Sequence, residues 1–243
     1  MLNGKIAVLT GASSGIGRAL AEALSKEGML IYLLGRDKKR LKEVAKIVKS
    51  NGSQAKIAGF DLTNGNEVKK FAADFKKRFK VLDLLIHSAG AVKLGHVEKA
   101  RLKDFDLQYK VNLRAPFQLT QVLLEPLKNS KSQIIFINSG SGLRANANWS
   151  QYAASKHGLK ALADSLRQEL SGTSVRVVSF YPGRTATTMQ EKVRKMENAD
   201  YNPKDYIQVD DFVNIIINSI KNPSQSAANI KVGLDGIEDY NFG

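Results

Sequence analysis

The 243-residue chain contains no cysteine, which excludes disulfide bonds, thiolate metal sites and cysteine nucleophiles. Its three histidines, His87, His96 and His157, lack the spacing of a zinc site, so we expect no metal. The apolar stretch at residues 6–9 is too short for a signal-peptide core or a membrane span. These absences together predict a cytoplasmic protein that does not use the membrane as a partner.

Acidic residues are scarce beside basic ones, with 23 Asp and Glu against 37 Lys and Arg and a net charge of +14. A basic balance can indicate a nucleic-acid or anionic membrane partner. Here the lysines are spread over helical segments such as residues 37–49 and 69–80 rather than gathered in one tail. We therefore favour a solvated surface that also attracts phosphorylated ligands over nucleic-acid binding, an alternative that strong salt-dependent retention on DNA would revive.

Short apolar runs alternate with helical patterns along the whole chain. The runs that suit strands buried on both faces are residues 5–10, 29–34, 54–60, 84–88, 133–138, 175–181 and 229–232. The helical patterns are residues 15–27, 38–50, 67–79, 102–127, 150–170 and 210–221. Strict alternation predicts a single α/β domain over residues 1–243, a Rossmann-type doubly wound parallel sheet of about seven strands with helices on both faces.

The polar stretch at residues 184–208 is long for a connection between a strand and a helix. Met189, Met196, Tyr201 and Tyr206 are interspersed in it. A loop of this length at the carboxyl ends of the strands predicts a substrate lid, although an ordinary surface excursion would have the same composition.

A glycine turn follows the first predicted strand and precedes a helix, in the sequence TGASSGIG at residues 10–17. Gly11 permits the tight turn, Gly15 lets a pyrophosphate approach the backbone, and Gly17 lets helix and strand pack closely. The free N–H groups and the dipole at the helix start then favour an anion. The turn therefore predicts a nucleotide phosphate site formed by Gly11, Ser13, Ser14, Gly15, Ile16 and Gly17.

The Thr-Gly-x-x-x-Gly-x-Gly form of this turn resembles the short-chain dehydrogenase/reductase (SDR) family, and the resemblance covers nearly the whole chain. It implies further cofactor contacts from Asp61, Leu62, Ser88, Ala89, Gly90, Pro182, Gly183, Thr185 and Thr187. Two positions depart from the usual family sequence: Ser88 stands where an asparagine ties the sheet together, and Thr185 replaces an apolar residue. His87, which ends a buried strand, is interpreted as structural.

The end of the second predicted strand indicates which nicotinamide cofactor binds. An acidic residue there would bind the ribose of NAD and repel a 2′-phosphate. The sequence instead reads Gly35-Arg36, with Arg40 close behind, and Asp37 is expected to cap the following helix. Since the Arg36 guanidinium suits a phosphate, and family members with Arg at this position typically prefer NADP(H), we predict NADP(H) with Arg36 and Arg40 as ligands.

Tyr152 and Lys156 are four residues apart in one predicted helix, so their side chains share a face. A free tyrosine has a pKa of about 10, and a nearby ammonium together with an oxidised nicotinamide would lower it. The resemblance implies that Ser139 binds the substrate carbonyl and that Asn112 distorts its helix to hold a water in a proton relay. Lys156 and Tyr152 would also contact the cofactor. We expect Ser141 and Trp149 to contact the substrate, with Leu143 and Asn146 flanking its pocket.

These elements together predict hydride transfer between NADP(H) and a small carbonyl or alcohol substrate, with Tyr152 as general acid and base. One alternative is a nucleotide-binding regulatory protein of the same fold without turnover. Another is an enzyme like the 3-oxoacyl carrier-protein reductases, although the C-terminal residues 238–243 differ from their usual endings. The predicted helices at residues 102–127 and 150–170 resemble the family's dimer-forming pair, which favours a homodimer or homotetramer.

Overall fold

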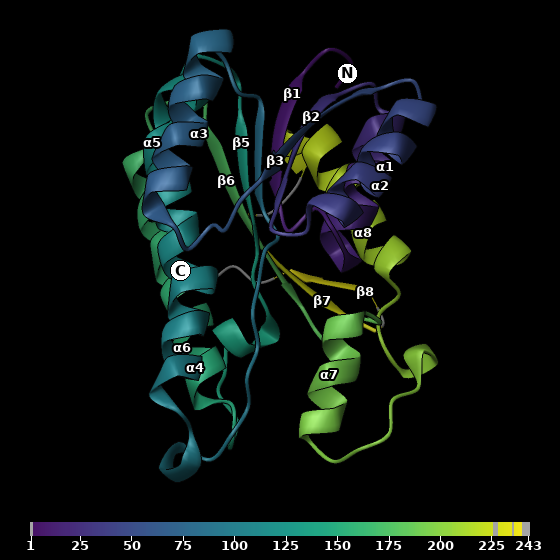
Figure 1. Ribbon diagram of the computed structural model, residues 1–243, viewed down its shortest axis with the longest axis vertical. Coiled ribbons are helices and arrows are strands. Elements are labelled where there is room, and N and C mark those ends of the chain that lie inside the picture. The colour runs from purple at the N-terminus through teal and green to yellow at the C-terminus, as the bar shows by residue number, and fades with distance from the viewer. Residues whose placement is uncertain (1, 226–227, 235, 240–243) are drawn as a thin grey trace.

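The computed structural model describes residues 2–225, 228–234 and 236–239. The strands of this part form one sheet in the order β3-β2-β1-β4-β5-β6-β7-β8, parallel except for the last pair (Figure 1). Their bounds are β1 Ile6–Thr10, β2 Leu30–Gly35, β3 Gln54–Gly59, β4 Leu84–His87, β5 Gln133–Ile137, β6 Arg176–Pro182, β7 Asn229–Gly233 and β8 Gly236–Asp239. The order reverses direction after β1, as in the Rossmann fold that the alternation predicted.

Helices cover both faces of the sheet, which confirms the doubly wound arrangement (Figure 1). Their bounds are α1 Gly15–Lys26, α2 Lys38–Ser50, α3 Gly65–Arg78, α4 Leu102–Tyr109, α5 Ala115–Lys128, α6 Ser150–Glu169, α7 Thr188–Met196 and α8 Val209–Lys221. The first face carries α1, α2 and α8, and the second carries α3, α5 and α6. Successive residues of β1 serve opposite faces, with Ala7 and Leu9 packing toward α1 and Ile6 and Val8 toward α3 and α5.

Three elements differ from the sequence-based expectation. The predicted helix at residues 102–127 is broken into α4 and α5 by a π-helical turn at Lys110–Arg114. The polar stretch 184–208 contains a helix, α7, because Thr187 caps its start by accepting a hydrogen bond from the Gln190 N–H at 3.2 Å. An antiparallel strand, β8, extends the sheet beyond the seven strands expected. The last residues of the C-terminal sequence, 240–243, lie outside the described part of the chain.

The carboxyl ends of the parallel strands meet at one edge of the sheet, and the segments that follow them face a common opening. Among the residues described, none of the helices combines the length and the apolar character needed to traverse a bilayer. The same residues contain no group of three His, Asp or Glu side chains placed to hold a metal ion.

Candidate functional site

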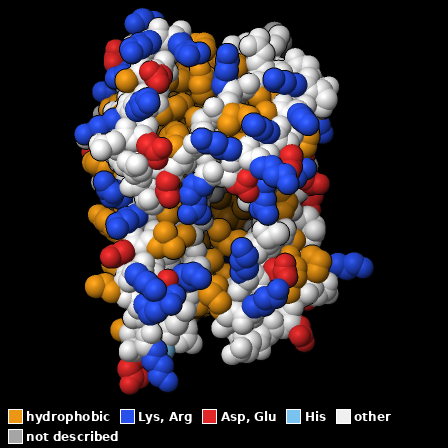
Figure 2. Space-filling view, in the orientation of Figure 1, with side chains coloured by type: hydrophobic (Ala, Val, Ile, Leu, Met, Phe, Trp, Pro, Cys, Tyr) orange, Lys and Arg blue, Asp and Glu red, His pale blue; other side chains and the backbone are white. Residues whose placement is uncertain are grey.

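A cleft of about 470 Å³ lies at the carboxyl ends of the strands, and the space-filling view shows the molecule hollowed there (Figure 2). Nearly all the predicted site residues line it. The predicted lining residues are Gly11, Ser13, Ser14, Gly15, Ile16, Gly17, Arg36, Asp61, Leu62, Ser88, Ala89, Gly90, Ser139, Ser141, Trp149, Tyr152, Lys156, Pro182, Gly183, Thr185 and Thr187. Arg40 and Asn112 are the predicted ligand and catalytic residues that do not line it.

The glycine turn is held so tightly that side chains are excluded from it. Gly11 has a φ of +68°, and a Cβ there would lie 2.8 Å from the backbone of Ala89. A Cβ on Gly17 would overlap the carbonyl group of Gly11. These contacts fix the turn between β1, the segment after β4 and the start of α1, as the spacing of the glycines predicts.

The start of α1 is arranged to receive an anion. No side chain caps the helix at Ser14, and its first turn contains no acidic residue. Gly15 has a φ of +52°, and its Cα faces Thr187, whose Cγ2 would lie 3.6 Å from a Cβ at this position. The N–H groups of the helix start are therefore open toward the cleft, which is the cradle that a pyrophosphate requires.

The Thr10 side chain ties β1 to the segment after β4, where Ser88 replaces the asparagine usual in SDR sequences. The Thr10 hydroxyl donates to the carbonyl oxygen of Ile86 at 3.3 Å. The Thr10 hydroxyl oxygen in turn accepts hydrogen bonds from the N–H groups of Ser88 at 3.0 Å and Ala89 at 3.1 Å. This cross-link holds Ala89 against Gly11 through the threonine.

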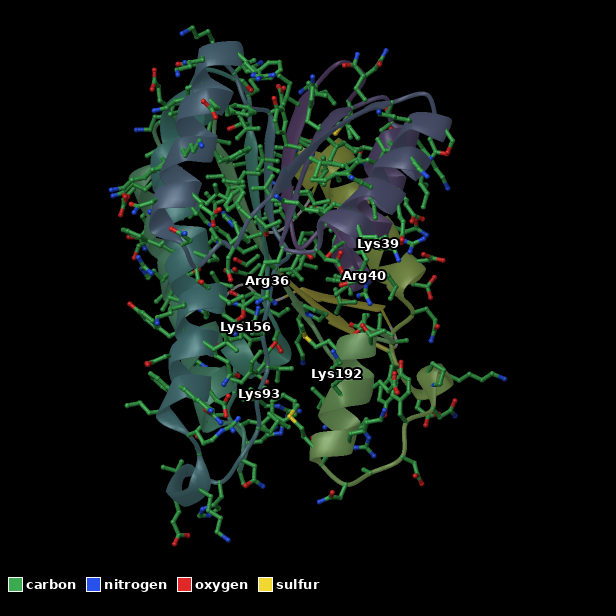
Figure 3. The ribbon with its side chains drawn as sticks, viewed as in Figure 1. Arg36, Lys39, Arg40, Lys93, Lys156 and Lys192 are labelled. Atoms are coloured by element: carbon green, nitrogen blue, oxygen red, sulfur yellow. The ribbon has the colours of Figure 1, made fainter. Side chains whose placement is uncertain are left out.

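The Arg36 side chain projects at the far end of the cleft and is 71% exposed. Its guanidinium lies 3.9 Å from the Asp61 carboxylate, too far for a hydrogen bond. Asp37 accepts from the Arg40 N–H at 3.1 Å, which confirms its predicted role as the cap of α2. The Arg40 guanidinium lies 3.4 Å from Asp37, so Arg36 is the less engaged of the two arginines (Figure 3).

Tyr152 and Lys156 lie on the same face of α6 and both line the cleft. The Lys156 ammonium nitrogen is 5.9 Å from the centre of the Tyr152 ring and donates to the carbonyl oxygen of Ile137 at 3.0 Å. The Ser139 side chain, two residues after β5, lies beside the Tyr152 hydroxyl and acts to lower its pKa. The structure thus brings a hydroxyl pair and an amine together over the last residues of β5.

Burial shifts the pKa of both titratable groups toward their neutral forms. It raises the pKa of Tyr152 to about 12, against which the Ser139 hydrogen bond acts in the lowering direction. It lowers the pKa of Lys156 from 10.5 to about 7. In the protein alone, the phenol is therefore harder to ionise than free tyrosine, opposite to the direction expected when an oxidised nicotinamide is also present. A Tyr152 pKa below that of free tyrosine would require the positive charge that a bound oxidised nicotinamide brings.

Asn112 lies in the π-helical turn and is 1% exposed. Its amide nitrogen donates to the Ala91 carbonyl at 2.8 Å and to the Ser155 hydroxyl at 2.9 Å, and its oxygen accepts from the Ala91 N–H at 2.8 Å. The distortion of the helix that the resemblance implied is present at this residue. The side chain braces the segment after β4 against α6 and does not face the cleft directly.

His87 is a structural residue, in agreement with the sequence interpretation. Its Nε2 atom is 2.9 Å from the Thr120 hydroxyl, and its ring stacks on Phe136 at 4.9 Å. Complete burial lowers the pKa of His87 to about 3, so the imidazole is neutral near pH 7.

The segment 184–208 forms one wall of the cleft through Arg184 and α7. The Arg184 guanidinium makes two hydrogen bonds to the Glu197 carboxylate, at 2.8 and 2.7 Å, and lies 5.7 Å over the Trp149 ring. Trp149 in turn packs edge-on against Tyr152 at 5.8 Å. Met189 lies across the cleft from Gly90. The segment is therefore linked to Tyr152 through Trp149.

Several lining residues were not singled out from the sequence. They are Phe60, Val92, Leu107, Val111, Arg144, Arg184, Gln190 and Val193. Leu107 and Val111 are four residues apart on a helix, a spacing that fits core packing equally well. Asn146 lines the cleft as expected, but Leu143 does not, and Tyr181, a residue of β6, is fully buried.

Comparison with known proteins assigns the family. Residues 5–198 match the short chain dehydrogenase family. An uncharacterized oxidoreductase of Staphylococcus saprophyticus is 34% identical over 207 residues, covering 84% of this chain and 88% of that protein. A short chain dehydrogenase from Salmonella enterica serovar Typhi superposes with a TM-score of 0.88 at 27% identity, covering 95% of this chain and 96% of the other.

A structure from Shigella flexneri solved in complex with NADP gives a TM-score of 0.86 at 27% identity, with 95% of this chain and 97% of that chain covered. Residues 5–198, which match the family, include the glycine turn, the Ser139–Tyr152–Lys156 cluster and the Pro182-Gly183 corner. The chain belongs to the short chain dehydrogenase family of oxidoreductases.

Proposed function

We propose that the protein catalyses NADP(H)-dependent interconversion of a small carbonyl compound and its alcohol. The observation that carries this proposal is the single cleft whose one end is the open start of α1 and whose other end is the Ser139–Tyr152 hydroxyl pair beside Lys156. When bound, the nicotinamide supplies the hydride donor or acceptor. The regulatory alternative would not require a buried hydroxyl pair and amine at the end of a nucleotide cleft.

Tyr152 is the proton donor and acceptor in this proposal. With a pKa of about 12, its phenol is protonated at neutral pH and can donate to a carbonyl oxygen, the step that reduction requires. Ser139 orients the same oxygen by hydrogen bonding. Lys156 supplies positive charge that stabilises the phenolate left behind, and Asn112 positions the segment that carries Ala91.

The residues at the Arg36 end fit NADP(H) better than NAD(H). Neither Gly35 nor Arg36 offers the carboxylate that binds the ribose hydroxyls of NAD. A Cβ on Gly35 would lie 3.7 Å from the Ser13 hydroxyl, so Ser13 and Arg36 border the same space. The weakly engaged guanidinium can bind a 2′-phosphate through two parallel hydrogen bonds. The bound NADP in the related Shigella structure supports this choice.

The test is the substitution Tyr152→Phe, assayed by NADPH absorbance with a panel of aldehydes and ketones. We expect kcat to fall by about 10³-fold because proton transfer is lost, while the Kd for NADPH stays close to that of the wild type. Tyr206→Phe, which alters a tyrosine outside the cleft lining, is the control. Near-normal turnover by Tyr152→Phe would remove the proposed role.

Residues 184–208 act as a substrate lid in this proposal. Gln190 on α7 lines the cleft and is 8% exposed, yet its amide nitrogen has no hydrogen-bond partner among the described residues. An unpaired buried donor costs about 1–3 kcal/mol. The packing of α7 therefore leaves a donor that a shift of the lid or a bound ligand would satisfy.

Self-association is part of the same proposal. Large apolar side chains are exposed along α4 and α5, namely Leu102, Phe105, Tyr109 and Phe117. Burying such a face between two copies is the usual solution in symmetric oligomers. We infer a homodimer or homotetramer without a nucleic-acid or membrane partner, testable by light scattering and by elution from DNA at rising salt.

A further inference from the structure

The cleft continues past Tyr152 to a mouth formed by three separate segments. Lys93 follows β4, Arg144 follows β5 and lines the cleft, and Lys192 lies on α7. Figure 3 shows Lys93 and Lys192 on the two sides of the lower part of the cleft, below Lys156. Basic side chains also border the hollow in the space-filling view (Figure 2). The fold therefore gathers cations from distant parts of the sequence at one opening.

None of these three cations forms an ion pair with any residue in the described part of the chain. The carboxylates near the mouth are already matched to other basic side chains. These pairs are Asp104 with Arg101 at 2.7 Å, Glu191 with Lys195 at 2.9 Å, and Glu197 with Arg184 at 2.7 Å and Arg194 at 3.0 Å. The positive charge at the mouth is thus left uncompensated by the protein.

The Arg101 hydrogen bond dominates the lowering of the Asp104 pKa, to which Lys93 adds a smaller Coulombic effect. Lys93 is therefore near this carboxylate without being its partner.

Part of the cleft lining is a group of apolar side chains. It includes Val92, Leu107, Val111, Met189 and Val193. Among the described lining residues, the one carboxylate is Asp61, which lies at the opposite end beside Arg36. A ligand whose carbonyl reaches Tyr152 would place an apolar body along this wall and its far end among the cations.

We propose that the substrate carries an anionic group, a carboxylate or a phosphate, at the end opposite its reactive carbonyl, and that Lys93, Arg144 and Lys192 select it. This inference rests on the proposed carbonyl reductase function and specifies its substrate class. The cations are exposed, so they act by attracting the anion into the cleft and by holding it loosely at the mouth. A neutral analogue would lose that attraction and keep the apolar contacts.

The test compares rigid aldehydes that differ chiefly in charge: 4-formylbenzoate against its methyl ester, and 4-formylphenyl phosphate against its dimethyl ester. We expect kcat/KM with NADPH to be about tenfold higher for the anionic member of at least one pair, with the advantage lost at high salt. The favoured pair distinguishes carboxylate from phosphate. The double variant Lys93→Glu/Lys192→Glu should abolish the advantage without changing turnover of the neutral aldehyde.

The control variant is Lys131→Glu, which makes the same change in an exposed residue before β5, at the opposite edge of the sheet. It should retain the preference for the anionic aldehyde. Equal kcat/KM within both pairs, or equal loss in the control and the double variant, would overturn the substrate proposal and leave the carbonyl reductase proposal standing.

A binding measurement decides the charge preference even where no aldehyde is reduced, an outcome that would count against the proposed function instead. Trp149 is the only tryptophan of the chain and lies in the cleft beside Tyr152, so its fluorescence reports occupancy. With NADP⁺ saturating the cofactor end, 4-formylbenzoate or the phosphate should bind about tenfold more tightly than its neutral partner, and only while Lys93 and Lys192 are present. Equal Kd values within both pairs overturn the inference.

Discussion

The two ends of the cleft differ in whether backbone or side chains form them. The phosphate end, made of the turn at residues 10–17 with Arg36 and Asp61, consists largely of backbone from one continuous stretch. The catalytic end, made of Ser139, Tyr152 and Lys156, consists of side chains that come from β5 and α6. Asn112 braces the catalytic end from a third element.

The two ends also differ in how they treat charge. Arg36 at the phosphate end is largely exposed, and water stabilises its ion without cost to folding. Tyr152 and Lys156 are 8% and 4% exposed, and burial displaces the pKa of each toward the neutral form. A solvent-exposed end suits the binding of a permanent anion. A buried end suits groups that must exchange protons near neutral pH. Burial of titratable groups therefore lowers the free energy of unfolding at the catalytic end and not at the phosphate end.

The largest effect expected from this comparison follows Lys156→Met. Because burial lowers the pKa of Lys156 to about 7 from 10.5, the unfolded chain binds more protons than the native protein between these values. The wild-type free energy of unfolding should therefore rise with pH from about 7 to 10.5. Below pH 7 the buried Lys156 is charged, and its destabilisation of the native state is at its full value. The variant should lack this rise and should lose about 10³-fold in kcat.

Urea unfolding at several pH values between 6 and 10 measures the slope, and Lys128→Met, at an exposed position of α5, is its control. If the free energy of unfolding has the same dependence on pH in both variants and the wild type, burial of the Lys156 charge does not destabilise the protein.

At the phosphate end, we expect substitutions of glycine to lower stability through steric overlap, not through charge. Gly17→Ala would drive a Cβ into the Gly11 carbonyl, a backbone group that cannot turn aside, and should lower the free energy of unfolding by about 3 kcal/mol. Gly15→Ala meets only the Thr187 side chain at 3.6 Å and should cost about 1 kcal/mol through its positive φ. Thermal unfolding ranks the two, and a larger loss for Gly15→Ala would contradict the packing argument.

Cofactor preference should change when the exposed charge of the phosphate end is reversed. Arg36→Asp replaces the guanidinium that we propose binds the 2′-phosphate with a carboxylate that repels phosphate and accepts hydrogen bonds from ribose hydroxyls. We expect the ratio of kcat/KM for NADPH over NADH to fall roughly 30-fold. Arg40→Ser should have less effect because Arg40 already pairs with Asp37. Unchanged NADPH kinetics in Arg36→Asp would contradict the assignment.

The same contrast explains which features the sequence could predict. The phosphate turn and the Tyr152–Lys156 pair follow from local spacing, since a strand, a glycine turn and a helical interval of four residues are encoded by neighbouring residues. The cap at Asp37 is equally local. Ser139 and Asn112 lie far from Tyr152 in sequence and came from the family resemblance, because no local pattern brings them together.

Features that depend on tertiary packing have little local signal, and the helix distortion at Asn112 was expected from the family resemblance alone. The π-helical turn at Lys110–Arg114 leaves no mark in the hydrophobic periodicity, because Asn112 is fixed by bonds to Ala91 and Ser155 in other segments. The polar sequence of α7, with its narrow apolar side, predicts a loop where the structure has a helix. The direction of the Tyr152 pKa shift in the protein alone depends on burial, which no spacing of residues reveals.

The smallest effect is expected where the lid joins the two ends. Thr187 faces the phosphate turn at Gly15, while Arg184 lies over Trp149 beside Tyr152. Glu197 holds Arg184 and Arg194 together, and the Arg184 hydrogen bonds lower its pKa below the usual value of 4.5. The stability that this carboxylate contributes is present above that value and is lost as pH falls through the lower folded pKa.

Glu197→Gln should loosen the lid without touching the reacting groups, so KM should rise about 3-fold with kcat nearly unchanged, because a neutral amide holds two guanidinium groups weakly. Glu191→Gln, on the helix that ends just before Glu197 and paired with exposed Lys195, is the matched control and should leave KM unchanged. Hydrogen exchange at residues 184–208 should quicken in Glu197→Gln alone. A fall in kcat instead would mean that Arg184 positions Tyr152 through Trp149, and the lid would then belong to the catalytic end.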